Sequence, residues 1–79
     1  MKGNPMKFSN WLTTQRVNAG LSKGELARRA GTTPKHVGGL ESGAVDPSYM
    51  RAKTILHLAE ALHPVSACDV LNAIAGSHE

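Results

Sequence analysis

The stretch Leu21–Gly43, LSKGELARRAGTTPKHVGGLESG, constrains the fold most, because it predicts two short helices joined by a tight turn. Ser22 and Glu25 stand three residues apart, which is the spacing of a capping box at a helix start. An apolar stripe for packing follows at Leu26, Ala27 and Ala30. Gly31 then ends this first helix, because glycine readily takes the backbone conformation that follows a last helical turn.

The second half of the stretch has its own start signal. Thr33 can cap the free N–H groups of a new helix, and Pro34 suits the first helical position, where no N–H is needed. Basic residues on the outward side of this second helix complete the layout of a helix-turn-helix DNA reader.

A longer series of landmarks surrounds this stretch, from Phe8 to Leu62. The landmarks are Arg16-x-x-x-Gly20-Leu21-Ser22, Glu25-Leu26-Ala27, Gly31-Thr32-Thr33, Val37, Leu40-Glu41-x-Gly43, Pro47-Ser48 and Leu58-Ala59-x-Ala61-Leu62. In this order and spacing the segment resembles the phage repressor and Cro class of helix-turn-helix regulators. The resemblance implies an all-α, five-helix repressor-like DNA-binding domain, with the helix-turn-helix at its second and third helices.

Length and charge agree with a small binding module. A chain of 79 residues hides too little surface to build a large enzyme cleft, so we expect no enzyme, no catalytic residues and no cofactor. The net charge is +3, and the basic residues concentrate in the first half. A single cysteine, Cys68, and the absence of an apolar run near the roughly 20 residues of a membrane span favour the cytoplasm and no membrane partner.

The rest of the chain predicts one domain over residues 8–76, preceded by a flexible arm at residues 1–7. Helix one is expected to start at the cap Ser9 and run to about Asn18, with Phe8, Leu12 and Ala19 facing inward. Helix four is expected after Asp46-Pro47-Ser48, with a buried stripe at Ala52, Ile55, Leu58, Ala59 and Leu62. Helix five opens with the box Ser66-x-x-Asp69. Its stripe either closes the core or meets a second copy, which makes Val70, Leu71 and Ile74 a possible dimer interface.

Two charged residues occupy apolar faces of predicted helices. Arg16 follows Leu12 by four residues, and Glu41 follows Val37 by four. Each charge would cost several kcal/mol if buried alone, whereas an arginine fork can meet both carboxylate oxygens. We therefore predict that Arg16 and Glu41 form a structural ion pair, and the resemblance implies the same pair.

The outward side of the second helix of the motif supplies the candidate DNA contacts. Lys35 is the first candidate for a base contact, and His36 is the second. Pro34 can touch a thymine methyl. The resemblance assigns phosphate or anchoring contacts to Lys23 and Ser42, while Thr32 and Thr33 add polar donors.

Three further residues have two interpretations each. Gly38 and Gly39 both weaken a helix. Gly39 either lets the backbone approach the DNA closely, or one of the two glycines packs tightly against another helix. Arg51, in a segment about three residues longer than the usual spacing of the class, either contacts a phosphate or is solvated.

The sequence thus predicts a sequence-specific regulator of transcription that binds double-stranded DNA, most simply a homodimeric repressor on a palindromic operator. Two alternatives stay open: an antitoxin-type DNA-binding regulator with a protein partner, and a protein-binding adaptor on the same fold. The four histidines have no cysteine or second histidine at ligand spacing, so no metal site is expected.

Overall fold

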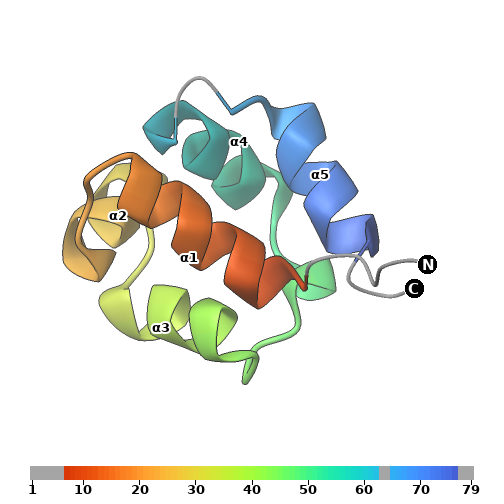
Figure 1. Ribbon diagram of the computed structural model, residues 1–79, viewed down its shortest axis with the longest axis horizontal. Helices are drawn as coiled ribbons and strands as arrows, with labels where there is room; N and C mark the ends of the chain where they lie inside the picture. Colours follow the sequence, from red (N-terminus) through yellow and green to blue (C-terminus); the bar gives the residue numbers. More distant parts are fainter. Residues whose placement is uncertain (1–6, 63–64, 77–79) are drawn as a thin grey trace.

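The computed structural model describes residues 7–62 and 65–76, and in these residues the chain is all-α. The predicted arm at residues 1–7 lies outside the described part, apart from Lys7. The α-helices are α1 (Phe8–Asn18), α2 (Lys23–Ala30), α3 (Pro34–Ser42), α4 (Ala52–Ala61) and α5 (Ala67–Gly76), and a short 3₁₀ helix, η1, spans Pro47–Tyr49. Figure 1 shows α1 crossing the molecule, with α3 on one side and α5 on the other. None of the helices within the described ranges is long and apolar enough to cross a membrane.

The helix-turn-helix is formed by α2 and α3, and the predicted caps are present. Ser22 and Glu25 exchange two hydrogen bonds: the Glu25 N–H donates to Ser22 Oγ at 3.1 Å, and the Ser22 N–H donates to Glu25 Oε1 at 3.2 Å. Gly31 ends α2 with a φ angle of +70°, a conformation that side chains with a Cβ resist. Thr33 Oγ1 then accepts the His36 N–H at 3.2 Å, so the turn between the helices is closed at both ends by local bonds.

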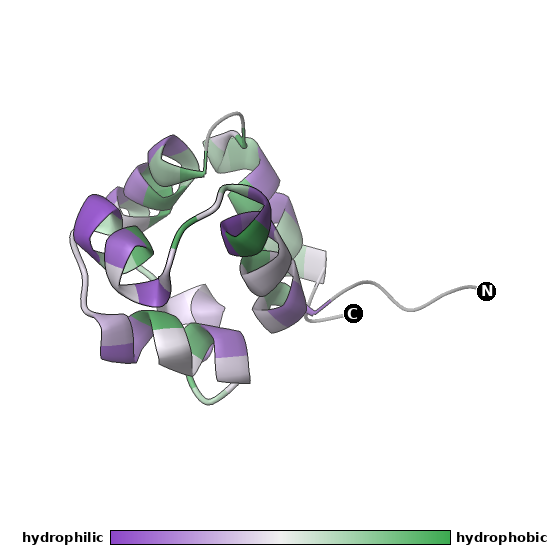
Figure 2. Ribbon diagram, turned by 60° about the vertical axis from the view of Figure 1, so that its left-hand side comes forward, coloured by the Kyte–Doolittle hydropathy of each residue, from purple (hydrophilic) through white to green (hydrophobic). Residues whose placement is uncertain are grey.

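One hydrophobic core joins all five α-helices. Helix α1 packs against α3 and α5, while α4 packs against α2 and α5. Figure 2 shows the hydrophobic segments on the sides where helices face one another. The core consists of Phe8, Leu12, Leu21, Leu26, Ala27, Ala30, Val37, Leu40, Leu58, Ala59, Leu62, Val70 and Ile74. Removal of this apolar surface from water is the main force that holds so short a chain together.

Three predictions about helix ends are wrong. Ser9 lies inside α1, because Lys7 takes the extended N-cap conformation and the helix begins at Phe8. Ala19 is exposed, because it is the C-cap of α1 and lies past the last turn that faces the core. Ala52 is exposed as well, because η1 and an extended Met50–Arg51 link delay the start of α4. Ile55 is only partly buried, and the fully buried part of the stripe begins at Leu58.

Helix α5 closes the core, which corrects most of the predicted dimer interface. The capping box of α5 is present, with the Asp69 N–H donating to Ser66 Oγ at 3.1 Å. Val70 is fully buried and Ile74 is 8% exposed, because α5 covers the apolar sides of α1 and α4. Neither side chain is available to a second copy. Leu71 is 52% exposed and is the one member of the predicted set at the surface.

Candidate nucleic-acid interface

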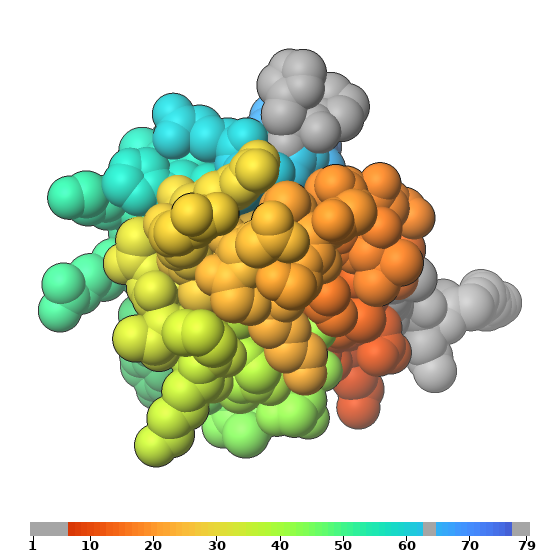
Figure 3. Space-filling view, turned by 90° about the vertical axis from the view of Figure 1, so that its left-hand side faces the viewer, coloured from red at the N-terminus to blue at the C-terminus, as the bar shows by residue number. Residues whose placement is uncertain are grey.

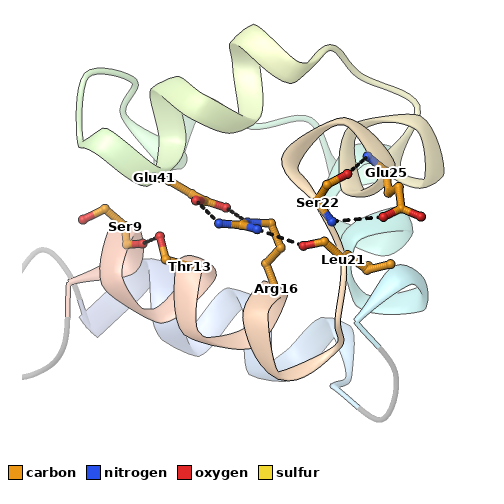
Figure 4. Close-up of polar contacts among 7 residues, drawn as sticks. All are labelled: Ser9, Thr13, Arg16, Leu21, Ser22, Glu25 and Glu41. Carbon is orange, nitrogen blue, oxygen red and sulfur yellow. Dashed lines mark hydrogen bonds and ion pairs between the residues drawn. The ribbon is translucent and has the colours of Figure 1, made fainter.

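Helix α3 is held in place by an arginine that reaches across from α1. Arg16 Nε donates to Glu41 Oε2 at 2.7 Å, and a second guanidinium nitrogen donates to Glu41 Oε1 at 3.2 Å. The third donor bonds the Leu21 carbonyl at 2.8 Å, at the entry to α2 (Figure 4). The two side chains are 15% and 5% exposed. The predicted pair is therefore present, and it fixes α3 relative to both α1 and the start of α2.

The surface formed by α2 and α3 carries most of the predicted DNA contacts. Figure 3 shows these two helices side by side on one face, with the residues around position 50 projecting at its edge. Lys23, Pro34 and Lys35 are exposed on this surface. Lys23 and Lys35 lie in the first turns of α2 and α3 respectively, so both cations stand at helix N-termini, where free N–H groups also favour anions.

A recess beside the turn brings three predicted residues together. Thr32, His36 and Arg51 line a hollow of about 270 Å³ between the helix-turn-helix and the start of α4. Its other lining residues are Gly31, Tyr49, Met50 and Thr54. None of the residues placed around this hollow is acidic. The recess therefore offers a guanidinium, an imidazole and hydroxyl groups to an anion such as a DNA phosphate.

Tyr49 and Thr54 also line this recess, although the sequence patterns did not point to them. Tyr49 is 86% exposed, an unusual position for a large aromatic side chain. The signal for Tyr49 was the added length of the segment before α4, which forms η1 and directs this residue outward. Nothing in the local pattern singled out Thr54, because its place in the recess depends on how α4 packs beside the turn.

Gly39 packs closely against the loop that follows α3. A Cβ added to Gly39 would lie 2.6 Å from Val45 Cγ2, so the loop after α3 occupies the space beside this residue. The Val45 N–H also donates to the Gly39 carbonyl at 3.1 Å. Internal packing, here against a loop and not another helix, therefore explains this glycine, and its contact with DNA stays a prediction.

Ser42 lies at the same end of α3 and is exposed, but its hydroxyl group has partners within the chain. Ser42 Oγ donates to the Gly39 carbonyl at 3.2 Å and accepts the Ala44 N–H at 3.4 Å. These bonds close the last turn of α3 together with Gly43, whose φ angle is +85°. The serine therefore supports the helix end, whatever contact it also makes with DNA.

The acidic residue nearest to Lys23 on α2 is Glu25, and its charge has a local role. The bond from the Ser22 N–H lowers the pKa of the Glu25 carboxyl below its ordinary value of 4.5, and the Ser22 hydroxyl group, Arg29 and Arg28 lower it further. The carboxylate thus stays ionised as the cap of α2. The arrangement as a whole supplies cations and hydrogen-bond donors on one surface, which is the chemistry that binds a nucleic acid.

A comparison with protein families agrees with this geometry. A family model described as helix-turn-helix, of the Cro/C1 type, matches residues 12–66, which include the whole of α2, α3 and α4. No curated protein and no solved structure is significantly similar to the chain. Members of the matched family are DNA-binding regulators of transcription and not enzymes. The chain belongs to the Cro/C1-type helix-turn-helix family of DNA-binding regulators.

Proposed function

We propose that this regulator binds a specific palindromic operator as a homodimer and represses transcription by occupying promoter DNA. The observation that carries the proposal is the exposure of Lys35 in the first turn of α3, next to His36, which lines the recess together with Thr32 and Arg51. Lys35 reads a base edge, while Lys23, Arg51 and the hydroxyl groups of the turn hold phosphates.

The proposal divides the surface into two kinds of contact. A lysine in the major groove donates to guanine O6 and N7 and so distinguishes sequences. A lysine that contacts a phosphate of the DNA backbone adds affinity for every sequence and makes binding depend on the salt concentration. Lys23 belongs to the second kind, because it lies at the start of α2, which leads into the motif and does not carry its exposed reading side.

Dimerisation follows from the size of the domain, which we take as residues 8–76. A single small domain covers one half-site, whereas two copies bind half-sites about 34 Å apart on a two-fold operator. Leu71 on α5 and Leu56 on α4 are 52% and 54% exposed and supply apolar surface away from α3. These two side chains are the candidates for the contact between copies.

The experiment is a binding series on DNA that the wild-type protein selects from a random pool, with a scrambled duplex as the reference. Lys23→Ala should weaken binding to both duplexes alike. It should also reduce the slope of log affinity against log salt by about 0.9 for each phosphate that the lysine neutralises. Lys35→Ala should weaken the selected duplex by about 1–3 kcal/mol more than the scrambled one.

Two protein chains should bind each palindrome in the same series. If Lys35→Ala lowers the affinity for both duplexes equally, Lys35 contacts a phosphate and does not read a base. Failure of the wild-type protein to select any sequence would contradict specific binding.

A further inference from the structure

Two adjacent glycines in α3 have different surroundings. At Gly39 an added Cβ would collide with Val45. At Gly38, apart from its two chain neighbours and the backbone of its own helix, none of the residues that the structure describes would lie within 4 Å of an added Cβ. Glycine is the least favourable residue of a helix interior after proline, and α3 has no packing reason for it at position 38.

The second half of the outer side of α3 is occupied by the chain itself. Val45 covers Gly39. The Ser42 hydroxyl group forms hydrogen bonds with two backbone groups, the Gly39 carbonyl and the Ala44 N–H. Pro34, Lys35 and Gly38 remain free on this side, within the first two turns of the helix. Gly38 lies one turn after Pro34 and Lys35, so these three residues form a continuous strip.

We propose that Gly38 is a specificity-determining residue, whose missing side chain lets the backbone of α3 lie against base edges in the major groove. This inference rests on the proposed DNA-binding function and adds that direct reading is confined to the first two turns of α3. The long Lys35 side chain donates a hydrogen bond to a base, and Gly38 determines how closely α3 approaches the base edges. A methyl group at position 38 faces the DNA and holds the helix away from the bases, although it fits the free protein.

The test compares Gly38→Ala with the wild-type protein on the selected and scrambled duplexes at one salt concentration, together with the melting temperature. We expect a melting temperature at or above that of the wild type, because alanine favours the helix and meets no neighbour. Affinity for the selected duplex should fall at least about tenfold, corresponding to about 1.4 kcal/mol, while affinity for the scrambled duplex stays within about twofold. Gly38→Ser, with a slightly larger side chain, should lose at least as much.

Gly39→Ala is the matched control, because it adds the same methyl group one residue along and should lower the melting temperature. Undiminished affinity of Gly38→Ala for the selected duplex would overturn the inference, as would an equal loss on both duplexes. Lys35→Ala separates this failure from failure of the proposed function. If Lys35→Ala loses sequence preference while Gly38→Ala keeps it, the proposed sequence-specific DNA binding is supported and the proposed role of Gly38 is contradicted. If the wild-type protein prefers no sequence, both are wrong.

Discussion

At the scale of single residues, Val45 in the loop after α3 restricts which residue can stand at position 39 of that helix. Its Cγ2 atom lies 2.6 Å from the place where a Cβ of residue 39 would be. The contact is with a β-branched side chain that is itself packed against the core, so it cannot simply rotate away. A residue that weakens the helix is therefore required by the packing of the loop.

This contact predicts a coupling between two substitutions. Gly39→Ala should lower the free energy of unfolding by about 1–3 kcal/mol through overpacking. In a Val45→Ala background the same change should cost nothing or stabilise, because the clashing methyl groups are gone and alanine favours the helix. Urea denaturation of the four proteins measures the coupling. An equal cost of Gly39→Ala in both backgrounds would show that Val45 is not the cause.

The second prediction at this scale concerns the pH dependence of α2. Hydrogen bonds from Ser22 lower the pKa of Glu25 in the folded protein, so the ionised form is favoured by folding. The stability that this carboxylate adds is complete above its ordinary pKa of 4.5 and is lost as the pH falls through the lower, folded value. An NMR titration should place the Glu25 midpoint below 4.5. A midpoint at or above that pH would contradict the capping role, and Ser22→Ala should move the midpoint upward.

At the scale of elements, the orientation of α3 depends on one arginine. Arg16 bonds Glu41 twice and the Leu21 carbonyl once, so it joins α1, α3 and the entry to α2 (Figure 4). Removal of this side chain would leave a nearly buried carboxylate and a carbonyl without their partner. The pair therefore fixes the orientation of α3, the second helix of the helix-turn-helix.

Replacement of either Arg16 or Glu41 alone should strongly lower the free energy of unfolding. Arg16→Ala and Glu41→Ala should each cost about 3–5 kcal/mol, because each leaves the other charge without its partner. The double replacement Arg16→Met with Glu41→Leu should cost less than the two single changes together, since no buried charge remains. Thermal denaturation of the set measures these costs. Losses of about 0.5 kcal/mol for each single change, the scale of an exposed pair, would show that the pair does not hold α3.

Local spacing made much of this architecture predictable. The boxes at Ser22 and Ser66 and the cap at Thr33 involve residues three positions apart, so a short stretch of sequence contains the whole interaction. Arg16 and Glu41 are 25 residues apart, yet their places on apolar faces left each with one sensible partner. The contact of Val45 with position 39 was not predictable in this way, because it depends on the path of a loop.

At the scale of the whole molecule, the apolar stripe of α5 packs into the core of its own domain. The periodic pattern of α5 could not decide between these roles, because an apolar stripe looks the same against its own domain and against a second copy. The packing of α5 on α1 and α4 decides it for Val70 and Ile74. Leu71 differs because it lies at the edge of this buried stripe and is 52% exposed.

Two alanine substitutions on α5 distinguish the core from the surface. Ile74→Ala should lower the free energy of unfolding by about 2–4 kcal/mol, because it removes buried methyl groups and leaves a cavity. Leu71→Ala should change the free energy of unfolding of the monomer by at most about 0.5 kcal/mol. Denaturation at a dilution where the protein is monomeric checks both values. Similar costs for the two variants would show that Ile74 is not part of the core.

The whole molecule presents a second hollow, of about 430 Å³, between α1 and α5. Trp11, Asp69 and Asn72 are among its lining residues, and its acidic group makes it a poorer site for DNA than the basic surface of α2 and α3. We therefore propose that DNA binds the surface of α2 and α3. Because the two hollows lie on different elements, signals from their residues can locate the DNA directly.

An NMR titration of the labelled protein with the selected duplex, followed at the backbone amides, provides these signals. We predict the largest shifts at Thr32, Lys35 and Gly38, with small shifts at Gln15 and Asn72 beside the second hollow. Largest shifts around Gln15 and Asn72, with the amides of α3 unchanged, would contradict this placement of the DNA.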